Sequence, residues 1–256
     1  MPRPQRRAPS PLPLVITLVL AGVGVAALTR PDALPGGLPE PLLAALPAPQ
    51  PQLLPQDFPL DPGREDTLFS QLDVADRDWQ PRAVPIPGGG TRYLYKRRAG
   101  DPPLSVEQIK ALMLNPPSFA MERRAIDALL LQLRRAGVRL VLGPPRKQGA
   151  AGEWEPRRTV LRIRPDVPAK GSREFARVLN HEAIHVAQSC RNGRVNARPK
   201  PLGLSRAVDA RSLRNLAAPI YAKASPQERV LEEEAYANQD NLTLGWQLLQ
   251  AHCRNR

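Results

Sequence analysis

Histidine, cysteine and aromatic residues are scarce in this chain of 256 residues, which has three histidines, two cysteines and only 4% aromatic residues. The two cysteines, Cys190 and Cys253, can form one disulfide in an oxidising compartment or remain as two unpaired buried thiols. The sequence also lacks internal repeats and any recognisable nucleic-acid-binding motif. We therefore expect no nucleic-acid partner, although the formal net charge is +13.

The positive charge is spread along the chain. Residues 1–30 hold four arginines and no acidic residue, so the remaining residues carry a formal charge of +9. A basic domain is attracted to anionic lipids and to anionic cell-wall polymers. A simpler interpretation also fits, in which these charges form an ordinary solvated surface, and we favour that one.

A long apolar run follows the basic N-terminus. Residues 12–28 are 17 residues without a charge, and three arginines precede them. This layout is typical of an export signal, and its length is close to the minimum for a membrane span. We predict an apolar helix within residues 1–30 that acts as a signal peptide or a membrane anchor. The positive-inside rule places the rest outside the cytoplasm, on the membrane or, after cleavage, periplasmic or secreted.

Ten prolines occur between Pro31 and Pro62. Proline lacks an N–H and disfavours helix in the preceding residue, so residues 31–63 are predicted to form an extended, semi-rigid linker. The composition becomes that of a globular domain from about Arg64. Residues 64–256 are predicted to form one α+β domain that is mainly helical and has a small β-sheet.

The hydrophobic pattern predicts the elements of this domain. Two alternating segments, 138–142 and 159–163, are predicted strands that form a hairpin or lie side by side, with a loop over 143–156. Gly88–Gly90 mark an earlier loop. Helices with a serine at the N-cap position are predicted over 105–114, 118–137, 172–193 and 225–249, and a further helix over 213–222.

The helix predicted over 172–193 contains the sequence His181-Glu182-Ala183-Ile184-His185. Histidines four residues apart lie on one face of a helix, because a turn has 3.6 residues. Both imidazoles can then bind one zinc ion, and Glu182 can act as the general base of a metal-assisted hydrolysis. Cys190 lies well round the helix from these histidines and is not expected to bind the metal.

A catalytic zinc ion usually has three protein ligands and one position open to water, so a third ligand is needed. The metzincin pattern is excluded, because Gln188 and Arg191 occupy the positions of its glycine and third histidine. His252 could reach the metal only if the chain folds back. The remaining option is a glutamate about 50 residues downstream, within residues 231–238.

The two segments together resemble the gluzincin-type zinc metallopeptidases. That family has His-Glu-x-x-His on one helix and a glutamate ligand on a second helix, often within Glu-x-Glu-Ala-Asp or Glu-x-Glu-Ala-Asn. The resemblance covers about residues 172–190 and 225–242. It implies a zincin-like metallopeptidase domain in which His181 and His185 bind zinc and Glu182 is the general base.

The resemblance leaves two choices for the third ligand. Aligning Glu-x-Glu-Ala assigns Glu232 and places Tyr236 where the family has aspartate or asparagine. Aligning on a glutamate followed four residues later by a carboxamide assigns Glu234, with Asn238 as a polar partner that can orient a histidine. We prefer Glu232. Glu233 is expected to point into solvent.

Further residues are candidates by type or position alone. The oxyanion of an acyl-transfer transition state needs a hydrogen-bond donor, which Tyr221 or Tyr236 could supply. Arg191 and Arg194 follow the histidine helix and could bind an anionic group of the substrate, although a surface role fits each of them better.

Three functions fit these features. The first is an exported or membrane-anchored zinc-dependent peptidase that acts on a peptide or protein, with Glu182 taking a proton from the attacking water. The second is a catalytically inactive, zincin-like basic binding module at the cell envelope. The third is a structural zinc site closed by a fourth ligand such as His252.

Overall fold

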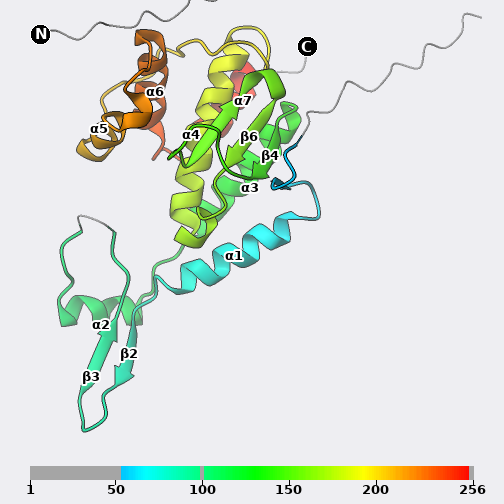
Figure 1. The fold of residues 1–256 in the computed structure, drawn as a ribbon. Coiled ribbons are helices and arrows are strands. Elements are labelled where there is room, and N and C mark those ends of the chain that lie inside the picture. The colour runs from blue at the N-terminus through cyan, green and yellow to red at the C-terminus, as the bar shows by residue number, and fades with distance from the viewer. Residues whose placement is uncertain (1–52, 99–100, 254–256) are drawn as a thin grey trace, which may run out of the picture. The chain divides into compact units, whose positions relative to one another are not determined.

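The computed structural model describes residues 53–98 and 101–253. Within these ranges the chain is α+β, as predicted (Figure 1). The strands and helices follow in the order β1 (Phe58–Pro59), α1 (Glu65–Arg77), β2 (Arg82–Pro85), β3 (Thr91–Leu94), α2 (Val106–Leu114), α3 (Ala120–Arg135), β4 (Arg139–Leu142), β5 (Gly152–Glu155), β6 (Val160–Ile163), α4 (Ser172–Arg191), α5 (Ala210–Leu216), α6 (Pro226–Asn238) and α7 (Leu244–His252). The apolar run 12–28 lies outside the described residues. None of the helices in the described ranges combines the length and hydrophobicity that a membrane span requires.

Four strands form a mixed sheet in the order β1-β4-β6-β5. The two strands predicted from the sequence are neighbours: β4 and β6 pair in parallel, with Arg139 opposite Val160. β5 pairs antiparallel with β6 and lies inside the stretch 143–156, so our prediction of a loop there was wrong. The strand of four residues was not predicted, because the stretch is rich in glycine and proline, and both residue types are typical of loops.

The folded part begins before Arg64, inside the segment 31–63 that we predicted to be a linker. β1 pairs antiparallel with β4, and Leu60 is buried in the core. The carboxylate of Asp57 accepts a hydrogen bond from the buried guanidinium of Arg162 on β6. These contacts are made with residues far along the chain, so the local proline content does not reveal them.

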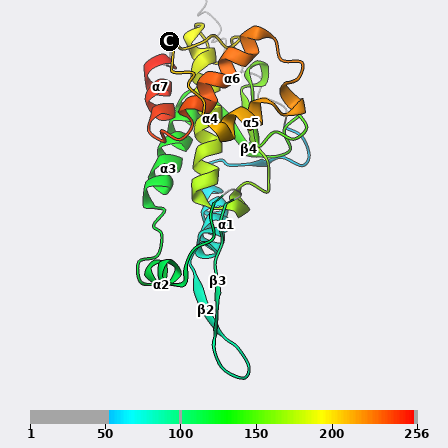
Figure 2. The same cartoon turned by 90° about the vertical axis from the view of Figure 1, so that its left-hand side faces the viewer.

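The central element is α4, which is buried along most of its length. It contacts β5 and β6 as well as α3, α6 and α7, and Figure 2 shows it between α3 and the sheet. Phe175, Leu179 and Ile184 are fully buried. Polar side chains on such a helix need partners inside the protein, because burying an unpaired polar group is costly.

Two of the predicted serine N-caps are confirmed. Ser105 and Ser225 each accept a hydrogen bond from the backbone N–H three residues later, and each forms a complete capping box. The start of α3 differs from the prediction by one residue, because Phe119 and not Ser118 is at its N-cap.

The start of α4 also differs, for a reason that involves α1. Gly171 is at the N-cap, and the serine expected there is the first helical residue. The backbone N–H and the hydroxyl of Ser172 both donate to the carboxylate of Asp76, at 2.7 and 2.6 Å. An acid from another helix thus satisfies the first turn of α4, where negative charge is favourable.

The segment predicted as one helix over 225–249 is two helices, α6 and α7. Asn180 of α4 holds the turn between them. Its Nδ2 donates to the carbonyls of Gln239 and Asn241, at 2.8 and 3.0 Å, and its Oδ1 accepts from the N–H of Gly245 at 2.9 Å. A Cβ at position 245 would lie 2.3 Å from that Oδ1, so α7 packs closely against α4.

Glycine and proline set several other element ends. The loop at Gly88–Gly90 is confirmed: it joins β2 and β3 as an antiparallel hairpin, and all three glycines have positive φ. Gly137 follows the end of α3 as predicted, with φ 76°. The helix predicted over 213–222 is instead α5 followed by a separate 3-10 turn at Pro219–Tyr221, because proline cannot donate the backbone hydrogen bond that would continue the helix.

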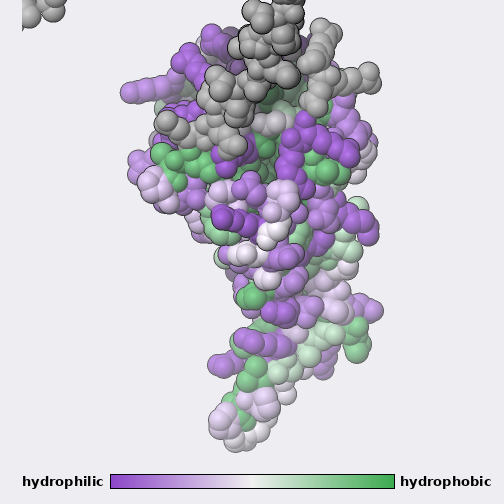
Figure 3. Space-filling view, turned by 90° about the vertical axis from the view of Figure 1, so that its right-hand side faces the viewer, coloured by the Kyte–Doolittle hydropathy of each residue, from purple (hydrophilic) through white to green (hydrophobic). Residues whose placement is uncertain are grey.

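The surface is polar over much of the face drawn in Figure 3. Large hydrophobic side chains are exposed at scattered positions, which include Leu114 at 82% and Met121 at 70%. Scattered apolar side chains are normal for a soluble surface and indicate no binding patch by themselves.

Candidate metal centre

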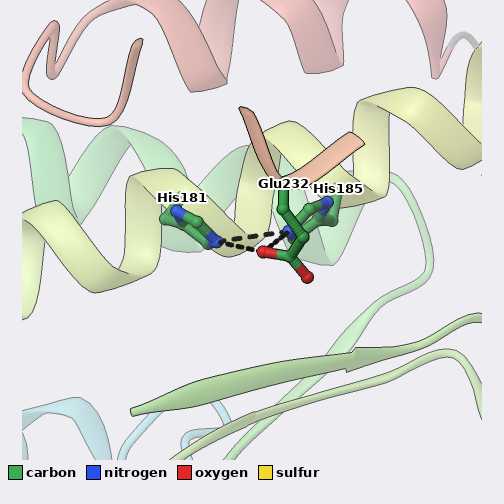
Figure 4. A group of neighbouring side chains, drawn as sticks. All are labelled: His181, His185 and Glu232. Carbon is green, nitrogen blue, oxygen red and sulfur yellow. Dashed lines mark hydrogen bonds and ion pairs between the residues drawn. The ribbon is translucent and has the colours of Figure 1, made fainter. Parts of the chain in front are cut away.

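Two helices bring His181, His185 and Glu232 together (Figure 4). One turn of α4 separates the two histidines, and their Nε2 atoms lie 3.2 Å apart. α6 supplies the glutamate, whose Oε2 lies 3.4 Å from Nε2 of His181 and 3.5 Å from Nε2 of His185. The ligand atoms of all three residues lie within 4.8 Å of one another, so the group could hold a metal ion.

Glu234, the other candidate for the third ligand, has different partners. It is 1% exposed, and its carboxylate accepts hydrogen bonds from the backbone N–H groups of Leu202, Gly203 and Leu204, at 2.8, 2.7 and 3.0 Å. It also accepts one from Nε2 of Gln188 at 3.0 Å. The carboxylate is thus committed to the loop that follows α4, and the histidines meet Glu232 instead.

Gln188 joins this buried carboxylate to the metal group. Its Nε2 donates to Glu234 and to the carbonyl of Leu231, so its Oε1 is free to accept. Oε1 lies 2.8 Å from Nδ1 of His185. Because an amide oxygen can only accept, Nδ1 of His185 carries a proton, and Nε2 is the ring nitrogen that faces the group. In the sequence, Gln188 serves only to exclude the metzincin pattern, and nothing there indicates its contact with His185.

We expect Gln188→Leu to weaken metal binding by about 10–100-fold, because His185 would lose the acceptor that fixes its orientation. Titration with a fluorescent metal indicator measures this. Gln239→Leu is the matched control, since Gln239 is also buried and lines the neighbouring cavity but its side chain donates to Ser212 instead of contacting an imidazole. Equal metal affinities for the two variants would contradict an orienting role for Gln188.

The charges of the group suit a cation. Burial lowers the pKa of His185, but the Glu232 carboxylate outweighs burial and raises that pKa to about 9. Burial raises the pKa of Glu232, but the two histidines outweigh it and hold that pKa well below its ordinary value. Without metal the group is therefore a histidinium–carboxylate pair, and a divalent cation would take the place of the proton.

Glu182 lies beside a cavity of about 260 Å³ that His181 also lines. Its side chain is buried, and burial raises its pKa although the two histidines act in the opposite direction. A carboxylate with a raised pKa is a better proton acceptor near neutral pH. The edge strand β5 packs directly on it: a Cβ at Gly152 would lie 2.6 Å from Oε1 of Glu182.

Both tyrosines that were candidates by type alone lie at this site. The hydroxyl of Tyr221 lies 3.2 Å from Oε2 of Glu232, to which it donates, and 3.1 Å from the hydroxyl of Tyr236. The ring of Tyr236 meets His181 edge-on, with 4.5 Å between centroids. Two phenol donors therefore lie at the edge of the metal group.

The arginines proposed from the sequence are elsewhere. Arg191, the last residue of α4, and Arg194 beyond the helix are both exposed. Neither lines the cavity, whereas Arg177 and Arg211 do. Sequence reasoning missed both. Arg177 had a usable signal, because it lies four residues before His181 and so on the same face of the helix.

The two cysteines form a disulfide, which rules out the alternative of two free thiols. Cys190 at the end of α4 is bonded to Cys253, and their Cα atoms lie 5.1 Å apart. His252 lies next to this disulfide and does not belong to the metal group found among the described residues. Within those residues the group therefore offers three candidate ligands.

Comparison of the chain with models of protein families, with curated proteins and with solved structures finds no match in any of the three.

Proposed function

We propose that this protein is a zinc-dependent peptidase. The observation that carries the proposal is the spacing of the three ligand atoms, which lie 3.2, 3.4 and 3.5 Å from one another. Ligand atoms about 2.0–2.1 Å from a tetrahedral zinc ion are about 3.3 Å apart. The three atoms are therefore already spaced as one face of such a tetrahedron.

The donor set supports zinc over other divalent ions. Two imidazoles and one carboxylate form the His₂Glu set of catalytic zinc sites, whereas calcium and magnesium prefer oxygen ligands alone. Three ligands leave a fourth position for water or substrate, which favours a catalytic site over a structural one. The resemblance to gluzincins, drawn from His181, His185 and Glu232, implies the same ligand set.

Zinc, when bound at these three residues, would supply a Lewis acid that polarises a carbonyl and makes a water molecule more acidic. Glu182 accepts the proton of the attacking water and then donates it to the leaving amine. The hydroxyl of Tyr221 or Tyr236 would donate to the oxygen that becomes negative in the transition state, in exchange for the hydrogen bond that it makes in the free protein. Gln188 keeps His185 in the tautomer that directs Nε2 at the site.

The position of β5 supports an extended substrate. Among the described strands it is at the edge of the sheet, next to β6. Trp154 fixes it against α4 by donating to Oγ of Ser189 at 2.9 Å, and Gly152 touches Glu182. A peptide that pairs with the free edge of β5 would run past the catalytic carboxylate, with its backbone hydrogen-bonded as an added strand.

We further propose that the zincin-like domain acts outside the cytoplasm. The apolar run at 12–28, with arginines before it, favours export or anchoring. The Cys190–Cys253 disulfide is independent support, because such bonds persist mainly in oxidising compartments.

The experiment is a cleavage assay with the full-length protein and a mixture of unstructured peptides, analysed by mass spectrometry. We expect cleavage that 1,10-phenanthroline stops and added zinc restores. No cleavage by a protein that contains one equivalent of zinc would contradict the proposal and would favour the non-enzymatic binding module. That alternative is also consistent with Tyr236, which stands where the family has aspartate or asparagine.

A further inference from the structure

The cavity beside the metal group continues along α4 to two arginines that take no part in the hydrolysis described above. Arg177 lies one turn before His181, and Arg211 reaches the same cavity from α5. Glu174 lies between them, since its carboxylate accepts a hydrogen bond from Arg177 at 2.7 Å and one from Arg211 at 3.5 Å. One carboxylate thus faces two guanidinium groups, and this end of the cavity is positively charged.

Arg177 has a buried donor without an acceptor. The residue is only 8% exposed, and among the described residues its Nε has no hydrogen-bond partner. A guanidinium offers five N–H donors, and the hydrogen bond to Glu174 uses one of them. Leaving a buried cation with unpaired donors is costly, so a ligand that brings acceptors to this position would be stabilised there.

The surroundings favour an anionic ligand. Glu174 and Arg211 also line an adjoining hollow of about 300 Å³, to which Arg98 and Lys170 contribute. Three cationic side chains line this hollow beside the single carboxylate of Glu174, and one of them, Lys170, also pairs with Asp166 at 3.1 Å. A carboxylate suits the site, because its two oxygens match the planar fork of a guanidinium group.

We propose that Arg177 and Arg211 bind a carboxylate of the substrate while the scissile carbonyl lies at His181, His185 and Glu232. This inference rests on the proposed function and specifies its substrate class. Four residues of helix place Arg177 about 6 Å from His181 along the axis, and an extended peptide advances about 3.3–3.6 Å per residue. The carboxylate therefore belongs to a residue about two positions from the scissile bond, as an acidic side chain or as the C-terminal carboxylate.

The test measures binding and does not require turnover. Zinc-loaded, full-length Glu182→Ala protein is immobilised and incubated with three pools of N-acetylated random hexapeptides. The first pool has free C-termini and no acidic residue, the second has amidated C-termini and one glutamate, and the third has amidated C-termini and no carboxylate. We expect the first or the second pool to be retained about tenfold more than the third, and the retained pool identifies the source of the carboxylate.

Variants locate the binding group. Arg177→Gln and Arg211→Gln are each expected to reduce the preference for carboxylates. The side chain of Arg211 is 47% exposed, so Arg211→Gln should fold and tests the proposal even if Arg177→Gln does not fold. Arg194→Gln removes the same charge outside the cavity and should keep the preference. A preference that survives both cavity variants would place the carboxylate on the metal and overturn the inference.

Equal retention of the three pools, or no retention of any, would also overturn the inference.

The failure of this inference can be distinguished from failure of the proposed function. Cleavage by the wild-type protein without any preference for carboxylates contradicts the inference alone. Carboxylate-dependent binding that needs Arg177, in a zinc-loaded protein that cleaves nothing, contradicts the peptidase alone.

Discussion

Replacing Glu182 with alanine is expected to lower kcat for peptide hydrolysis by about 10²–10⁴-fold while zinc remains bound, because general-base catalysis contributes rate enhancements of that size. Glu182 lies in the cavity beside His181 but is not one of the three residues whose ligand atoms converge. Its loss should therefore affect the chemical step and leave the metal in place. Progress curves together with elemental analysis of the same samples measure both quantities.

Glu182→Gln separates charge from volume, since it keeps the shape of a side chain that packs against Gly152. It should be as inactive as the alanine variant, because an amide cannot accept the proton. Glu107→Ala, at an exposed position of α2 outside the cavity, is the control and should keep full activity. Wild-type kcat in Glu182→Gln would exclude this residue as the base.

Removing the disulfide is expected to lower the free energy of unfolding by about 4 kcal/mol. The bond joins Cys190 to Cys253 across 63 residues, and in the chain-entropy model a loop of that length restricts the unfolded state by about this amount. The closed loop contains α5, α6 and all of α7, and therefore Glu232. The double variant Cys190→Ala/Cys253→Ala should unfold at a correspondingly lower urea concentration.

The control for this prediction is the wild-type protein under a strong reductant, which should unfold at the same urea concentration as the double variant. Reductant should leave the double variant unchanged. A loss of less than about 1 kcal/mol in the double variant would show that the unfolded chain is not restricted by the bond in the way that the model assumes.

The features that the sequence predicted correctly are those that depend on neighbours along the chain. His181 and His185 lie on one face because helical geometry requires it. The capping box at Ser225 and Glu228 formed as its spacing indicates. The choice of Glu232 over Glu234 followed a family pattern and agrees with the geometry, but nothing in the local sequence excluded Glu234, whose partners are backbone groups some 30 residues earlier.

The features that the sequence missed depend on distant partners. β5 exists because it pairs with β6 and packs on α4. The break between α6 and α7 depends on Asn180, a side chain from another helix. Only the fold shows that Arg177 is 8% exposed and lies beside the cavity. The local helix and strand propensities of the residues do not predict such contacts, because the contacts arise from tertiary packing.

The most direct test of the central claim is the zinc content of the purified full-length chain after dialysis, measured by mass spectrometry. We expect about one zinc ion per chain in the wild type and close to none in His181→Ala and Glu232→Ala, because each variant removes one of three ligands. Glu233→Ala, which removes the neighbouring carboxylate on α6, should bind zinc like the wild type. Equal zinc in the wild type and in His181→Ala would contradict the metal centre and the function built on it.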